Sequence, residues 1–118
     1  MAGHSTPAPS LPRMLQIVLC ACPPTAADTI ADDLVGARLA ACVSVLPGMR
    51  STYRWQGAIE RSDEALLVIK TQASRVPAVT ERILALHPYE LPEVIAVEAA
   101  GGLPAYLAWV AAEVHEED

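Results

Sequence analysis

Three cysteines and one histidine carry the side chains that a soft or borderline metal ion prefers. Cys20 and Cys22 are separated by one residue, Cys42 follows, and His87 precedes Pro88. Cys20 ends a predicted first strand, and His87 ends a predicted second helix, which should finish near the opposite rim of the sheet. Cys20 and His87 therefore need not meet within one subunit, although a neighbouring subunit could bring them together.

Each of these residues also has an ordinary structural interpretation. A buried cysteine is usually a small hydrophobic residue, and a histidine at a helix end often satisfies the last carbonyl groups. The single residue between Cys20 and Cys22 differs from the usual spacing of paired zinc ligands. An odd number of cysteines excludes a complete disulfide framework, so we expect reduced thiols in a cytoplasmic protein.

A second group of residues combines charges with aromatic rings. Glu60, Glu64 and Lys70 all occupy even-numbered positions, so on a strand their side chains point to the same face. They could project into a polar groove, or they could be solvated charges or a structural ion pair. Trp55, Tyr89 and Glu90 lie near predicted edges, where aromatic side chains also serve as subunit contacts. The whole set favours a cleft between subunits that binds a small ligand or a partner.

The composition excludes several classes of function. The chain has 118 residues, a net charge of -6 and no run of Lys or Arg, so phosphate backbones would be repelled and we expect no nucleic-acid partner. No run approaches the ~18 apolar residues that span a bilayer, so we expect no membrane partner. Phosphate-binding glycine loops, nucleophile elbows and paired-histidine zinc motifs are missing, and we expect no enzymatic activity.

Hydrophobic periodicity and turn signals divide the chain into a tail and one domain. Residues 1–13 are predicted to be a disordered tail, and residues 14–115 a single domain. Strands are predicted at 14–20, 42–55, 58–60, 64–71 and 93–98, with helices over 26–40, from about 74 to 87, and from 103 onward. The order β-α-β-β-α-β with a terminal helix predicts an α+β, ferredoxin-like fold.

One predicted strand carries apolar residues on both faces. Leu66 and Val68 point one way, whereas Leu67 and Ile69 point the other way. In a ferredoxin-like fold the helices cover only one face of the sheet, and no remaining segment is long enough to cover the second. Hydrophobic residues make up 53% of the chain, so the composition also indicates more apolar surface than one small domain can bury. We therefore expect an oligomer.

Four motifs in register resemble the CutA divalent-cation tolerance family. They are Leu-Ala-Ala-Cys-Val-Ser-Val-Leu-Pro-Gly at 39–48, Tyr-Arg-Trp-Gln-Gly at 53–57 followed by Glu64 and Ile-Lys-Thr at 69–71, His-Pro-Tyr-Glu-Leu-Pro-Glu at 87–93, and Tyr-Leu-Ala-Trp at 106–109. Their order and spacing agree from about residue 15 to residue 114. The resemblance covers everything except the two tails.

The resemblance implies a tightly packed homotrimer similar in build to PII signalling proteins, with a role in tolerance to divalent metals, notably copper. Cys20 and His87 occupy the positions of the copper ligands proposed for bacterial members. Where some members carry a second adjacent histidine, this chain has Leu86. The leading prediction is a protein that binds copper or another divalent cation, and the alternative is a PII-like regulatory trimer with ligands in intersubunit clefts.

Overall fold

The computed structural model describes residues 15–114, so the predicted tail at 1–13 lies outside the described residues. The main elements are β1 (Leu15–Cys22), α1 (Ala27–Gly36), β2 (Cys42–Trp55), β3 (Ala58–Gln72), α2 (Val76–Leu86), β4 (Ile95–Glu98) and α3 (Pro104–Glu113). Single 3-10 turns precede the first two helices, η2 (Pro24–Ala26) before α1 and η3 (Ala73–Arg75) before α2. The α+β, ferredoxin-like prediction is confirmed.

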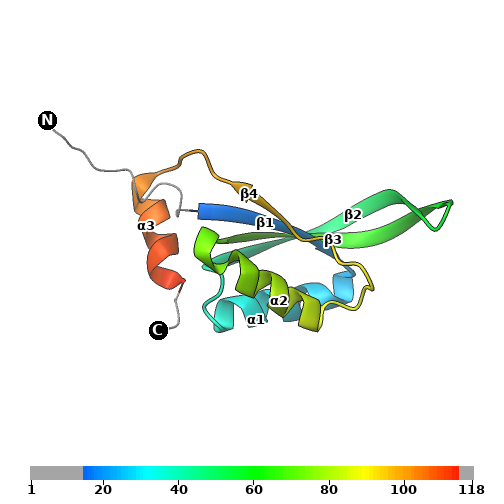
Figure 1. Ribbon diagram of the computed structural model, residues 1–118, viewed down its shortest axis with the longest axis horizontal. Coiled ribbons are helices and arrows are strands. Elements are labelled where there is room, and N and C mark those ends of the chain that lie inside the picture. Colours follow the sequence, from blue (N-terminus) through cyan, green and yellow to red (C-terminus); the bar gives the residue numbers. More distant parts are fainter. Residues whose placement is uncertain (1–14, 115–118) are drawn as a thin grey trace, which may run out of the picture.

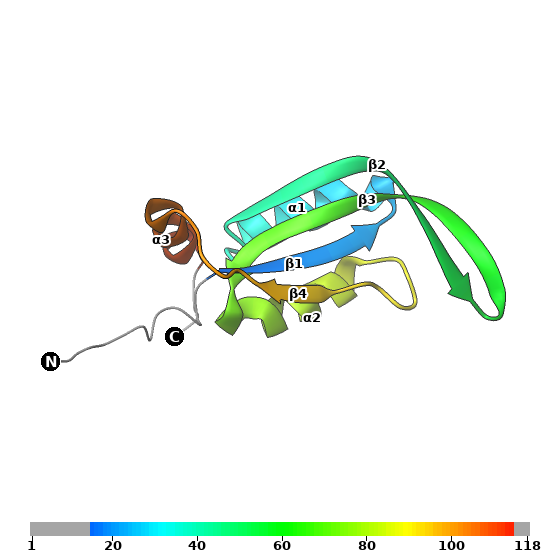
Figure 2. The same cartoon turned by 90° about the horizontal axis from the view of Figure 1, so that it is seen from above.

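The four strands form one antiparallel sheet in the order β2-β3-β1-β4. Helices α1 and α2 lie side by side beneath one face of this sheet, as Figure 1 shows from the side and Figure 2 from above. Helix α3 packs at the end of the sheet where β1 begins, through Leu15, Val110 and Val114. The architecture is therefore a two-layer sandwich with one extra helix at its end.

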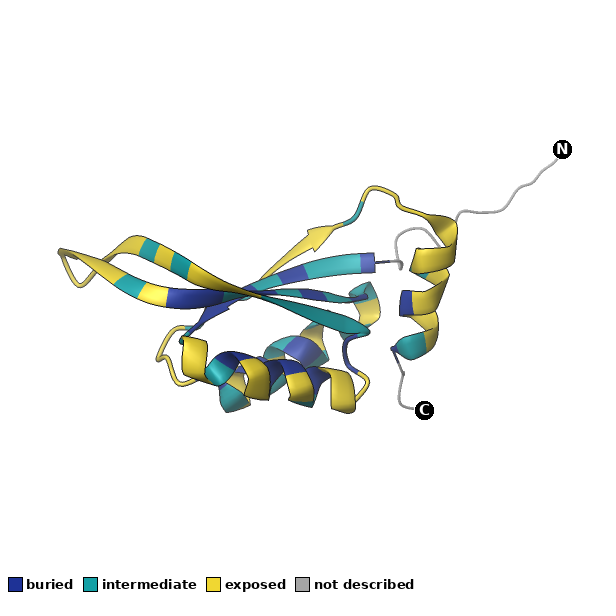
Figure 3. Ribbon diagram, turned by 180° about the vertical axis from the view of Figure 1, so that it is seen from behind, coloured by how far each residue is buried: buried dark blue, intermediate teal, exposed yellow. Residues whose placement is uncertain are grey.

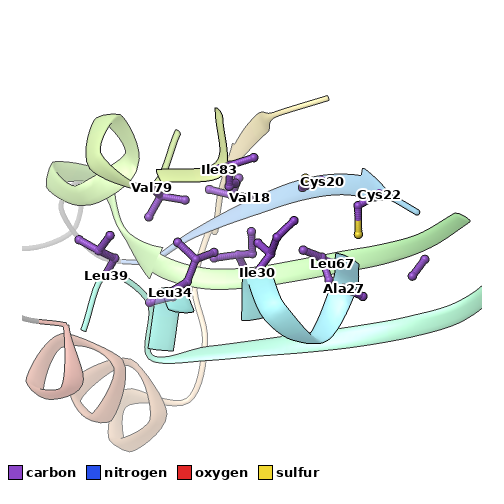
Figure 4. Packing of buried hydrophobic residues seen from close by; sticks show 13 residues of the cluster. Val18, Cys20, Cys22, Ala27, Ile30, Leu34, Leu39, Leu67, Val79 and Ile83 are labelled. Atoms are coloured by element: carbon purple, nitrogen blue, oxygen red, sulfur yellow. The ribbon is translucent and has the colours of Figure 1, made fainter. Parts of the chain in front are cut away.

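The main core lies between the sheet and the two covering helices (Figure 4). On the sheet side, Val18, Cys20 and Leu67 are fully buried, and Ile30 of α1 and Ile83 of α2 pack against them. The predicted strands at 58–60 and 64–71 are one continuous strand, β3. The alternation predicted for 64–71 is confirmed, because Leu67 and Ile69 are buried while Leu66 and Val68 on the other face are only half-buried.

The hairpin of β2 and β3 extends well beyond the rest of the sheet. The pairing of β1 with β3 ends at Cys22 and Ala65, so farther out each hairpin strand has only the other as a neighbour. We call residues 49–64 the ribbon; it projects freely in Figure 1, and most of it is exposed in Figure 3. A two-stranded hairpin alone is marginally stable in water, so this one needs support from elsewhere.

Two local features follow from residues with positive φ. A register shift between Leu46 and Met49 marks a bulge at Pro47-Gly48, where Gly48 has a φ of 79°. The first helix ends at Gly36, earlier than the predicted residue 40. Arg38 adopts a φ of 61°, a left-handed conformation that terminates the helix and turns the chain into β2.

The sheet face opposite α1 and α2 is apolar and open. The register places Leu19 of β1 in one row with Val68 of β3 and Ile95 of β4. In the next row Ile17 lies opposite Val97, and Ile95 and Val97 are 52% and 47% exposed. Neighbouring strands thus share a continuous apolar surface that the described residues cover only at the α3 end.

Candidate binding site

A pocket of about 760 Å³ opens where the ribbon leaves the sheet. We call residues 88–93, which connect α2 to the last strand, the 88–93 segment; it faces the ribbon across this pocket. The lining comes from the end of β1 (Ala21), from the ribbon (residues 51–55, Ser62 and Glu64) and from the 88–93 segment (residues 88–91 and Glu93). The volume is in the range of sites for small organic ligands.

Glu64 and Tyr89 join the two sides of this pocket. The Tyr89 hydroxyl donates a hydrogen bond to Glu64 Oε2 at 2.8 Å. Glu64 is only 5% exposed, whereas Tyr89 is 37% exposed. Loss of solvent, the hydrogen bond to Glu64 and the negative charge of Glu64 together raise the pKa of Tyr89 to about 12. Tyr89 therefore remains a neutral donor throughout the physiological pH range.

His87 fixes the start of the 88–93 segment through both ring nitrogens. The backbone N–H of Tyr89 donates to His87 Nδ1 at 3.1 Å, so Nδ1 is unprotonated. The ring Nε2 carries the proton and hydrogen-bonds to the carbonyl oxygen of Ala21 at 2.8 Å. His87 also caps α2, because its backbone N–H donates to the carbonyl of Ile83. The buried imidazole thus links the end of β1 to the segment that carries Tyr89.

The expectation that the second helix ends near the opposite rim of the sheet, away from Cys20, is wrong. Cys20 Sγ lies 3.8 Å from the Ala21 carbonyl oxygen that also accepts the His87 hydrogen bond. The physical reason is the strand direction: β3 runs antiparallel to β1, so the helix that follows it returns toward the end of β1. The second helix therefore ends beside Cys20, and not at the opposite rim.

The arrangement of this pair does not suit a bound copper ion without change. Burial, followed by the nearby charges of Cys22, Glu93 and Glu64, raises the pKa of the Cys20 thiol to about 12. A metal ion binds the thiolate, which this environment disfavours. Both His87 nitrogens are already hydrogen-bonded. Among residues 15–114, no group of three or more His, Cys, Asp or Glu side chains is placed to hold a metal ion.

The pocket brings together four of the six predicted cleft residues, namely Trp55, Glu64, Tyr89 and Glu90. Glu60 and Lys70 do not line it. Lys70 Nζ instead donates to Ser44 Oγ at 2.7 Å on the open sheet face. Alternation along a strand shows that residues share a face but not that they are close, because each residue adds about 3.3 Å to the distance along the strand.

Sequence reasoning missed other pocket residues, notably Tyr53, Ser62 and Glu93. Tyr53 and Ser62 are joined across the ribbon by a hydrogen bond of 2.7 Å between their hydroxyl groups. The alternation of Ser51, Tyr53 and Trp55 along one strand is a signal that could have located this side of the pocket. Glu93 follows a proline in a segment with no regular periodicity, and no comparable signal marks it.

The pocket is rich in negative charge and in aromatic rings. Three carboxylates line it, those of Glu64, Glu90 and Glu93, against one guanidinium, that of Arg54. The ion pairs found in residues 15–114 join Arg38 to Glu113 and Arg82 to Asp33, and neither involves the pocket. None of the described helices is long and apolar enough to cross a membrane.

Comparison with known proteins shows the family. Residues 16–113 match the family model described as CutA1 divalent ion tolerance protein. The chain is 46% identical to the divalent-cation tolerance protein CutA of Thermus thermophilus over 98 residues, which cover 82% of this chain and 95% of that one. It spans only 57% of the length of the mouse Protein CutA, to which it is 46% identical over 85% of its own length.

Solved structures agree with this match. The CutA structure from Xylella fastidiosa superposes with a TM-score of 0.84 at 50% identity and covers 86% of this chain and 98% of that one. The PII-like protein CutA from Nostoc sp. PCC 7120 gives a TM-score of 0.81 at 34% identity, with 85% and 97% of the two chains covered. The chain therefore belongs to the CutA1 divalent ion tolerance protein family, with a PII-like fold.

Proposed function

We propose that this protein is a homotrimeric, cytoplasmic binding module that responds to divalent cations, and that it binds a small ligand in the pocket between the ribbon and the 88–93 segment. The observation that carries the proposal is the Glu64–Tyr89 hydrogen bond of 2.8 Å inside a pocket of about 760 Å³. Glu64 is only 5% exposed, and a buried carboxylate with one side-chain hydrogen bond and no ion pair among the described residues is suited to pair with a ligand group.

Two surfaces support the trimer. The open sheet face carries a continuous apolar surface that includes Leu19, Val68 and Ile95, of which Ile95 is 52% exposed. Beyond Ala65 the two ribbon strands pair only with each other among the described strands, although Glu64 at the base of the ribbon is hydrogen-bonded to Tyr89. Packing of neighbouring protomers on the open face and along the ribbon would cover both surfaces at once. The pocket at the base of the ribbon would then lie close to subunit boundaries.

The connection to divalent cations comes from relatives such as the divalent-cation tolerance protein CutA of Thermus thermophilus. Copper binding by Cys20 and His87 stays a prediction for this chain. It requires loss of the Cys20 proton and of one His87 hydrogen bond, so affinity for Cu(I) should rise with pH. Cys20→Ser should weaken copper binding far more than Cys22→Ala does, and equal binding by wild type and the Cys20→Ser, His87→Ala double variant would exclude this site.

The proposed small-molecule function is tested by thermal-shift screening of the reduced full-length protein against amines, nucleotides, carboxylates and divalent metal ions. Wild type and Tyr89→Phe should be screened together. The proposal expects at least one small molecule to raise the melting temperature of the wild type and to stabilise Tyr89→Phe less. A screen in which only metal ions stabilise the protein, equally in both variants, would contradict the proposal.

A further inference from the structure

The charge distribution of the pocket restricts the chemistry of its ligand, and this inference rests on the proposed function. Glu64 has one hydrogen bond among the described residues, from the neutral Tyr89 hydroxyl, and no cationic side chain within ion-pair distance. A buried carboxylate loses solvation energy, which a single hydrogen bond restores only in part and an opposite charge restores further. Glu64 therefore favours a positively charged ligand group.

The rest of the lining adds to this negative potential. Glu64, Glu90 and Glu93 contribute three carboxylates, against one guanidinium, that of Arg54, among the lining residues. An anionic ligand would have to enter against this potential, whereas a cationic ligand would be attracted by it.

The size and spacing of the site argue for an organic cation and against a bare metal ion. Glu64, Glu90 and Glu93 line one pocket, yet they do not form a cluster that could hold a metal ion. A single ion of small radius therefore cannot satisfy these carboxylates together. A cation with charges separated by an apolar spacer can reach more than one of them.

The aromatic lining also favours an organic cation. Tyr53, Trp55 and Tyr89 line the pocket together with the carboxylates. Aromatic faces attract ammonium groups, and they also stack with the planar guanidinium group. A lining of carboxylates and aromatic rings is thus suited to a cation with an apolar body.

We propose that the pocket binds a small organic dication, such as an alkyl diamine or a guanidino-amine, with one charged end at Glu64 and its apolar body against the aromatic lining. The guanidino-amine is the better ligand of the two, because its planar group can both pair with a carboxylate and stack on a ring.

The test uses compounds of matched shape and opposite charge. Agmatine and butane-1,4-diamine carry two positive ends on a four-carbon spacer, and adipate carries two carboxylates on the same spacer. Mg²⁺ controls for a bare double charge. The full-length chain with Trp109→Phe keeps Trp55 as its one tryptophan, which lines the pocket and reports binding by fluorescence.

Agmatine should bind at least tenfold more tightly than adipate, and butane-1,4-diamine should fall between them. Glu64→Gln should weaken agmatine binding at least tenfold, whereas Glu60→Gln, a matched change on the ribbon outside the pocket, should leave it unchanged. If Glu64→Gln fails to fold, Glu93→Gln and Trp55→Leu serve the same purpose, each with an expected loss of at least threefold.

Adipate binding as tight as agmatine binding would overturn the organic-cation inference and leave the proposed function intact. If agmatine does not bind while a neutral or anionic compound binds in a Tyr89-dependent way, the organic-cation inference is likewise overturned and the proposed function stands. Absence of any small-molecule binding in the wider screen would overturn the proposed function itself.

Discussion

Tyr89 and Glu64, which are 25 residues apart in the sequence, meet in a hydrogen bond of 2.8 Å between the tyrosine hydroxyl and Glu64 Oε2. This bond connects the segment after α2 to the ribbon and forms part of the pocket wall. It is the contact on which the proposed binding function depends, and its electrostatic consequence can be measured directly.

Glu64→Gln should lower the pKa of Tyr89 toward its ordinary value. In the wild type this pKa is raised to about 12, above its value of 10 in a model compound, by desolvation and by the bond to Glu64. A folded-state pKa above the unfolded value adds stability below pH ~10, and this stability is lost as the pH rises toward 12. Spectrophotometric titration of the tyrosines in wild type and Glu64→Gln measures the shift, and Tyr53→Phe identifies the contribution of the ribbon tyrosine. An unchanged titration curve in Glu64→Gln would argue against the contact.

Cys20 should be unreactive toward alkylating reagents in the folded protein. Burial raises its pKa from 9.0 to about 12, which leaves on the order of a thousandfold less thiolate at pH 8 than an ordinary thiol. The stability associated with the neutral thiol is present below pH 9 and declines as the pH rises from 9 to 12. Mass spectrometry after timed alkylation should show modification of Cys20 only on the time scale of unfolding. Rapid labelling of Cys20 at neutral pH, in protein shown to be folded, would contradict the prediction.

The fold could be predicted from sequence because its signals are local. The alternation of Leu66–Ile69, the turn at Gln56-Gly57 and the helix end before Pro88 each depend on a few adjacent residues. The site could be predicted only in part, because it joins the ribbon to a segment after α2. Glu64 and Tyr89 were both candidates, but no local pattern indicates that they touch. The adjacency of Cys20 and His87 was missed because it depends on the direction in which α2 runs across the sheet.

Val68→Glu should convert the proposed trimer into monomers. Val68 lies on the open sheet face in one row with Leu19 and Ile95, where a charge would be buried against a neighbouring protomer. Light scattering at low micromolar concentration should give about three times the 12.5 kDa chain mass for the wild type and the mass of one chain for the variant. Leu84→Glu, on the outer side of α2 at 56% exposure, is the matched control and should remain a trimer. A monomeric wild type would contradict the proposed assembly.

His87→Ala should loosen the 88–93 segment more than it destabilises the whole chain. The change removes the hydrogen bonds from His87 to Ala21 and from Tyr89 to His87, and we expect a loss of about 2 kcal/mol in the free energy of unfolding. Amide hydrogen exchange should accelerate most at Tyr89, whose N–H loses its acceptor, and far less at Ile83 within α2. Uniform acceleration across α2 and the 88–93 segment would indicate that His87 acts only as a core residue.

The central claim is that the pocket between the ribbon and the 88–93 segment is the binding site. The most direct test is calorimetric titration of the reduced full-length protein with the best small molecule from the thermal-shift screen and, separately, with Cu(I). We predict that Tyr89→Phe, which removes only the hydroxyl group that reaches Glu64, weakens small-molecule binding about tenfold while the trimer persists, and that Cys20→Ser leaves it unchanged. Full-strength small-molecule binding in Tyr89→Phe, or binding of Cu(I) alone with complete loss in Cys20→Ser, would contradict this account.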